Sequence, residues 1–320
     1  MQVMFLTLYK RGKNDLWRYI ITVLGVMIAY LFIGQIPLTL VLIQKTTEKN
    51  GGNFDMGGLA EVAETMDFAS VGISLNYTLV LILLTFLTAF IALWIFVKFL
   101  HKRPFKTLIT AAPSLNWGKI IFAFSIWMLM SMGIELVSYF LNPGNYTFNF
   151  DPSQFWILLA IAFTLLIVQT SFEELFMRGY LMQGIASASS MRWIPLVLTS
   201  VFFGALHLAN PEVGKFGVYT MMTYYIGTGL FLGIITLMDD ALELALGIHA
   251  ATNIFSAVFV TFNDSALQTP ALFKMAEVNV NIMLILFFAA AVIFTIICAK
   301  KYGWDDWSKC YGPVEQEEVA

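Results

Sequence analysis

The fold is decided by residues 157–178, which read ILLAIAFTLLIVQTSFEELFMR. The stretch is mostly apolar up to residue 172, then carries two adjacent acids, Glu173 and Glu174, and a base at Arg178. Apolar runs of about 20 residues cross the hydrocarbon core of a bilayer, where an ionised side chain costs roughly 2.5–3.5 kcal/mol. The stretch therefore predicts a membrane helix whose charges have a function.

The composition of the whole chain supports this interpretation. Of its 320 residues, 59% are hydrophobic and 12% are charged, whereas soluble domains are about one quarter charged. The apolar residues form long runs, so we expect an all-α protein, a polytopic bundle of about eight transmembrane helices in one membrane domain over residues 1–320. The eight runs are 19–43, 78–100, 117–141, 154–177, 193–209, 216–238, 241–262 and 280–299.

Basic residues orient this bundle, because Lys and Arg near helix ends favour the cytoplasmic side. Fourteen of the 18 Lys and Arg residues, Arg178 among them, lie inside when both termini are cytoplasmic. The four left outside are Lys45, Lys49, Lys215 and Lys274. Residues 44–77 then form an external loop with a short surface helix, and 302–320 form a mobile cytoplasmic tail.

Several classes of function are excluded or disfavoured. A net charge of −3 without a block of like charge predicts no nucleic-acid partner. The two cysteines, Cys298 and Cys310, cannot build a disulfide framework or a Cys-rich zinc site. The chain also lacks His-Glu-x-x-His, Gly-x-Ser-Gly and Gly-x-Gly-Asp, the motifs of three kinds of intramembrane protease.

Polar side chains within the apolar runs are the candidate site residues. Two of the three histidines, His207 and His249, lie in such runs. Positions four apart share a helix face, whereas neighbours point about 100° apart. Three pairs have this spacing: Glu174 with Arg178, Phe203 with His207, and His249 with Asn253. Glu173 therefore points away from the Glu174–Arg178 pair and needs a partner on another helix.

These groups suit peptide hydrolysis by activated water. Glu173 is the candidate general base, and His207 would hold the water with it. His249 and Asn253 would donate hydrogen bonds to the oxyanion, each typically worth about 2.7–4 kcal/mol in the transition state. We expect Glu174 and Arg178 to brace the helix and Phe203 to form a cavity wall. Counting residues from the helix ends suggests an intramembrane cavity that opens to the cytoplasm.

Other interpretations remain open at this point. A single buried His or Asn more often joins helices structurally, and intramembrane Glu, His and Arg also build proton-coupled transporters. A non-catalytic membrane immunity or scaffold protein is a further alternative. Glu243 lies near a helix end, where it can reach water, and Glu135 has no identified partner. Gly229 and Gly233 indicate close helix packing.

The ordered set of elements resembles the CPBP family of intramembrane proteases, which includes CAAX prenyl proteases of the Rce1-like type and the Abi family. The elements are Glu173-Glu174-x-x-x-Arg178, Phe203-x-x-x-His207 and His249-x-x-x-Asn253, within a core of about residues 150–262. Each element alone is weakly specific, whereas the three in this order are specific.

The resemblance implies an eight-helix fold with a cytoplasmic cavity, in the bacterial plasma membrane. It implies the roles already given: Glu173 as base, His207 as its partner, His249 and Asn253 as oxyanion donors, and Glu174 with Arg178 as support. The expected partners are membrane lipid and a peptide or membrane-protein substrate, whether lipidated or not. No cofactor is specified: Glu173, His207 and His249 are also a possible ligand set for a divalent metal such as zinc.

Overall fold

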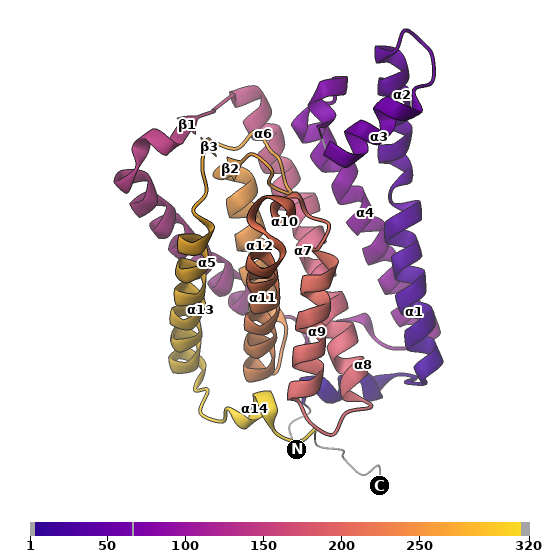
Figure 1. Cartoon of the computed structure of the whole chain (residues 1–320). Coiled ribbons are helices and arrows are strands. Elements are labelled where there is room, and N and C mark those ends of the chain that lie inside the picture. Colours follow the sequence, from indigo (N-terminus) through magenta and orange to yellow (C-terminus); the bar gives the residue numbers. More distant parts are fainter. Residues whose placement is uncertain (1–3, 66, 315–320) are drawn as a thin grey trace.

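All eight apolar runs form helices in the computed structural model, which describes residues 4–65 and 67–314 (Figure 1). Within these residues, six helices are long and apolar enough to cross a membrane: Leu16–Lys49, Leu75–Leu100, Trp117–Leu141, Pro152–Ala186, Val218–Asp239 and Val280–Tyr302. The predicted all-α membrane bundle is confirmed. The count of eight spans is not, because α9 (Trp193–Leu206) and α12 (Glu243–Val258) extend only about 21 and 24 Å.

The order of the elements follows the predicted runs. The first span contains α1 (Leu16–Ile28) and α2 (Ile36–Lys49). The other helices are α3 (Met56–Thr65), α4 (Leu75–Ile95), α5 (Trp117–Leu141), α6 (Pro152–Ile161), α7 (Ile167–Glu174), α8 (Gln183–Ala186), α9, α10 (Pro211–Phe216), α11 (Val218–Asp239), α12, α13 (Val280–Tyr302) and α14 (Ser308–Tyr311). Short 3-10 turns are η1 (Phe5–Arg11), η3 (Phe68–Val71), η5 (Phe105–Leu108) and η6 (Pro143–Asn145).

Four π-helical segments lie within or at the ends of long helices: η2 (Ala29–Ile33), η4 (Phe96–Leu100), η7 (Ala162–Leu166) and η8 (Leu175–Met182). The fourth span runs through two of them without a break, from α6 to α8. Its start is capped by Asp151, whose side chain accepts from the backbone N–H of Ser153. Segment η8 begins directly after Glu174, and π segments inside α-helices frequently occur at functional sites.

Glycines let the helices around the site approach closely. A Cβ at Gly229 on α11 would lie 2.8 Å from the Cα of Ser200 on α9. A Cβ at Gly247 on α12 would collide with the backbone carbonyl of Ile120 on α5. The predicted close packing at Gly229 is therefore present, and these contacts fix how α9, α11 and α12 are placed around the fourth span.

The two ends of the bundle differ (Figure 1). A small sheet of order β1-β3-β2 lies at one end, formed by β1 (Tyr146–Phe148), β2 (Val260–Phe262) and β3 (Phe273–Met275). Strand β3 pairs antiparallel with β1 and parallel with β2. Helix α14 lies at the opposite end, which we call the basic end because it carries clusters such as Lys300 with Lys301.

Three predictions about individual segments need comment. The orientation rule predicts Arg178 on the cytoplasmic side with the other basic residues, whereas the side chain is fully buried inside the bundle and paired with Glu174. The loop 44–77 does contain the predicted short helix, α3. In the predicted mobile tail, Val314 is buried and its backbone N–H donates to Ser190. The rest of that tail, 315–320, lies outside the described residues.

Candidate functional site

The three motif-bearing segments meet in the middle of the bundle. Helix α7 and segment η8 carry the two glutamates and the arginine, His207 directly follows the end of α9, and α12 carries His249 and Asn253. Helix α12 packs against α7, and α9 packs against η8. All seven side chains predicted from the sequence therefore lie around one place, although they come from segments far apart in the chain.

Glu174 is the centre of a buried charge network. Its Oε1 atom accepts from Arg178 Nη1 and from His249 Nδ1, each at 2.7 Å. The carboxylate and the guanidinium are both fully buried, and Arg178 Nη2 also donates to the carbonyl of Gly229 at 3.1 Å. The sequence predicted the pair with Arg178. It did not predict that the same oxygen orients His249.

Phe203 supports this network from α9. Its ring lies 4.7 Å from the Arg178 guanidinium carbon and packs edge-on against the His249 ring at 6.1 Å. A buried guanidinium over an aromatic face gains about 2 kcal/mol or more. The predicted role of Phe203 as a wall of the site thus includes a direct contact with the buried charge.

Glu173 lies beside this network with one oxygen committed and one free. Gln169 Nε2 donates to Glu173 Oε1 at 2.6 Å. The Oε2 atom has no hydrogen-bond partner and lies 3.4 Å from His249 Nε2. A buried carboxylate oxygen without a donor is costly unless water or a ligand binds it. The Oε2 atom of Glu173 can therefore accept a hydrogen bond from a bound group.

His207 is held by its own helix. Its Nδ1 lies 2.7 Å from the carbonyl oxygen of Phe203, which can only accept, so Nδ1 carries the proton. In the neutral ring, Nε2 is then an acceptor. The ring stacks on Tyr225 at 4.3 Å and 25°, and the Tyr225 hydroxyl accepts from Asn210. Within the described residues the imidazole at ion-pair distance from Glu173 is His249, not His207.

Asn253 joins the site through a residue that we did not single out in the sequence. Its Nδ2 atom donates to Gln169 Oε1 at 3.0 Å. Gln169 is 6% exposed and contacts Glu173 as well. The sequence carries a signal for it, since Gln169 precedes Glu173 by four positions in an apolar run and so shares its helix face.

A cavity of about 80 Å³ joins these residues. Each buried water needs about 10–15 Å³ on this measure, so several waters fit. Its polar lining residues, which we call the polar wall, are Gln169, Glu173, His207, His249, Thr252 and Asn253. Its aromatic lining residues, which we call the aromatic wall, are Trp127, Phe203, Tyr224, Tyr225, Phe231 and Phe287. The cavity thus combines polar side chains with a large aromatic surface.

The described residues do not form a metal site of the predicted kind. No group of three or more His, Cys, Asp or Glu side chains in residues 4–65 and 67–314 is arranged to hold a metal ion. The Nδ1 atoms of His207 and His249 bond to Phe203 and Glu174, so Nε2 is the atom of each ring that is left for a metal. The three side chains Glu173, His207 and His249 are not gathered as ligands in this arrangement, and the expected metal set stays a prediction.

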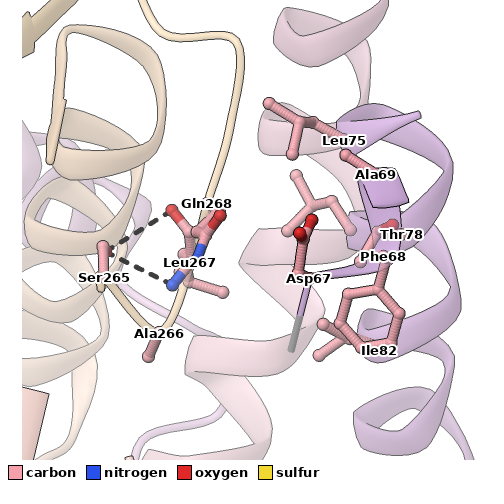
Figure 2. A pocket seen from close by; sticks show the side chains of 11 residues that line it. Asp67, Phe68, Ala69, Leu75, Thr78, Ile82, Ser265, Ala266, Leu267 and Gln268 are labelled. Atoms are coloured by element: carbon pink, nitrogen blue, oxygen red, sulfur yellow. Dashed lines mark hydrogen bonds between the residues drawn. The ribbon is translucent and has the colours of Figure 1, made fainter. Parts of the chain in front are cut away.

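A second cavity, of about 30 Å³, lies near the end of the bundle that carries the sheet. Figure 2 shows it between α4 with the preceding turn and the loop 265–268, where the Ser265 side chain bonds to the backbone of Leu267. Asp67 is its one charged lining residue. None of the predicted site residues lines it.

Glu135 and Glu243, to which the sequence assigns no role in the site, lie away from the cavity at Glu173. Glu135 accepts from the Tyr146 hydroxyl at 2.5 Å, which ties α5 to β1. Glu243 was expected to reach water, but it is 1% exposed because the start of α12 packs under α5, and it accepts from the backbone of Asn116 at 3.3 Å. Both have structural partners away from the cavity.

Comparison with known proteins gives two matches. Residues 154–255 match the family model described as type II CAAX prenyl endopeptidase Rce1-like. The chain is also 32% identical over 273 residues to "Uncharacterized protein YyaK" of Bacillus subtilis, covering 84% of this chain and 86% of the relative. No solved structure matches the chain. The matched family segment contains all three motifs and every residue of the polar wall.

Proposed function

Because this chain belongs to the Rce1-like family of type II CAAX prenyl endopeptidases, we propose that it cuts peptide bonds with a water activated by Glu173 in the membrane cavity. Membership of this family identifies the chain as a membrane protease. The observation that supports the finer proposal is the unpartnered Oε2 atom of Glu173, next to His249 and facing a cavity with room for water.

The first step is attack by water. A water between Glu173 Oε2 and His207 Nε2 gives a proton to Glu173, and its oxygen bonds to the scissile carbonyl carbon. His207 Nε2 accepts a hydrogen bond from the second hydrogen of the water, which stays on the attacking oxygen, because the ring proton is on Nδ1 and bonded to Phe203. General-base assistance of this kind contributes about 10²–10⁴-fold to a rate.

The second step is collapse of the tetrahedral intermediate. His249 Nε2–H and the amide of Asn253 donate to the oxyanion while the carbon–nitrogen bond breaks. Glu173 returns its proton to the leaving amine, which restores the carboxylate. His249 must carry both ring protons for this role, and the Glu174 carboxylate at Nδ1 stabilises that charge.

The substrate and the location are part of the proposal. The aromatic wall supports a peptide or membrane-protein substrate with an apolar side chain next to the cut, surrounded by membrane lipid. The Bacillus relative and the basic end support a bacterial plasma membrane with both termini cytoplasmic. The proposed steps use only side chains and water, and a chelator test on the purified protein will determine whether a divalent metal is also needed.

The decisive experiment compares the protein termini in membranes from cells expressing the wild type and Glu173→Gln. The variant keeps the shape of the side chain and removes the base, so we expect a set of peptide termini to disappear. Glu64→Gln, at an exposed position on α3, is the matched control and should leave that set unchanged. Identical termini in wild type and Glu173→Gln would overturn the proposal and favour a non-catalytic scaffold. Glu173-dependent solute flux without cleavage would favour a transporter.

A further inference from the structure

Gln169 connects two groups that the proposed function assigns to different steps. Its Nε2 atom donates to Glu173 Oε1 at 2.6 Å, and its Oε1 atom accepts from Asn253 Nδ2 at 3.0 Å. The side chain is buried at 6% exposure on α7, one turn before Glu173. It thus joins the water-activating base on α7 to the amide on α12 through two hydrogen bonds.

The direction of this chain of hydrogen bonds is fixed by Glu173. An ionised carboxylate can only accept, so Gln169 must present its NH₂ group to it. The carbonyl oxygen of Gln169 then faces Asn253 and can only accept. Asn253 must therefore present its own NH₂ group, one hydrogen of which is used by Gln169 and the other of which remains available.

We propose that Gln169 is a positioning residue that holds the Asn253 amide in the orientation that donates to the oxyanion, and that it couples this orientation to the charge on Glu173. The proposal rests on the function proposed for the same site. Without the Gln169 carbonyl, the Asn253 amide can turn over and present its oxygen, which repels an oxyanion.

A purely structural role predicts something different. A buried glutamine that only joins helices affects the stability of the fold and leaves kcat and KM of the folded enzyme unchanged. Gln183, on the same spanning segment, is the matched control: it is fully buried, donates to the carbonyl of Thr107 and accepts from Arg103. Replacing either glutamine by Met removes two hydrogen bonds at similar volume.

The first test needs no enzyme activity. Solid-state NMR of the full chain in lipid bilayers, with labelled Gln, Asn and Glu side chains, should show a direct contact between the Gln169 amide nitrogen and the Glu173 carboxylate. The Asn253 amide signal should shift in Gln169→Met and stay in place in Gln183→Met. Absence of the Gln169–Glu173 contact, or an Asn253 signal that ignores Gln169→Met, overturns the proposal.

The second test uses a peptide that spans a cut found in the comparison of termini. Gln169→Met should lower kcat about 10- to 100-fold with little change in KM, because the positioned amide acts in the transition state. Asn253→Ala should cause a similar loss. The kcat of the double variant should be no more than about threefold lower than that of the less active single variant, since both changes remove the same positioned amide.

The kinetic outcomes separate the two roles. Losses that multiply in the double variant, or an equal loss of kcat in Gln183→Met, would assign Gln169 a structural role only. If the wild type cleaves no peptide, the proposed function fails while the NMR result still determines whether Gln169 orients Asn253. Failure of the inference is therefore distinct from failure of the function.

Discussion

His249 donates from Nδ1 to Oε1 of Glu174 across 2.7 Å, and the same oxygen accepts from Arg178. Glu174 therefore neutralises a buried arginine and also fixes the ring of a histidine at the cavity. These two tasks can be separated by mutation, because one depends on charge balance and the other on a hydrogen-bond acceptor.

Arg178→Leu should destabilise the protein by about 3–5 kcal/mol, because it leaves Glu174 fully buried without its cation. The double variant Glu174→Leu/Arg178→Leu removes both charges and should recover much of that stability. It should remain inactive, since His249 Nδ1 then has no acceptor. Thermal unfolding in detergent and cleavage of the mapped peptide check these outcomes, and full activity in the double variant would show that His249 needs no orientation by Glu174.

Tyr225 should matter through its ring more than through its hydroxyl. Tyr225→Phe keeps the stack on His207 and loses the bond from Asn210, at a cost of about 0.5–1.5 kcal/mol in stability with cleavage nearly unchanged. Tyr225→Leu frees the His207 ring, and misplacement of a reacting group by about 1 Å costs about 10²-fold in rate. Equal cleavage rates in the two variants would show that the stack has no role.

Gly229→Ala and Gly233→Ala should differ although they lie one turn apart on α11. At Gly229 the new methyl meets the backbone of Ser200, with Cα at 2.8 Å and the carbonyl oxygen at 3.1 Å. At Gly233 it meets only the flexible ends of Leu196 and Met182. We expect a loss of about 1–3 kcal/mol for Gly229→Ala and a smaller change for Gly233→Ala, measured by thermal unfolding. The reverse order would indicate that α9 and α11 do not approach at Ser200.

His101, beyond the end of the second span, should make stability depend on pH. Burial lowers the pKa of this imidazole from its usual 6.5, against a smaller raising effect of its bond to the Lys13 carbonyl. Its Nε2 lies 2.9 Å from the Tyr180 hydroxyl. The unfolded chain therefore binds the proton more readily, so stability is lost as pH falls below about 6.5. His101→Gln should weaken this dependence in unfolding temperatures measured between pH 5 and 7.5, and an unchanged slope would assign it to other groups.

The sequence predicted the parts of the site that depend on one helix. The four-residue spacing of Glu174 and Arg178 gives their ion pair directly, and apolar length gives the bundle. It could not determine that His249 rather than His207 lies at ion-pair distance from Glu173, because this depends on how α9 and α12 are rotated against α7. That rotation is set by contacts between helices, such as those at Gly229 and Gly247.

The sequence also does not predict where the two short helices, α9 and α12, end. The run 241–262 is predominantly apolar to its end, yet α12 ends at Val258 because 260–262 pairs with β3 instead. Likewise, α9 ends at Leu206, where the His207 ring bonds back to Phe203. Both endings depend on partners or side-chain bonds that hydropathy does not record.

The N-terminal turn η1 has a consequence for how the protein is made. Phe5, at its start, is fully buried, and its backbone N–H donates to Asp240, which lies 235 residues later between α11 and α12. The contact of η1 with Asp240 therefore cannot form until residue 240 has been synthesised, by which point five of the six long apolar helices have been made. A chain that stalls before residue 240 leaves Phe5 without this partner.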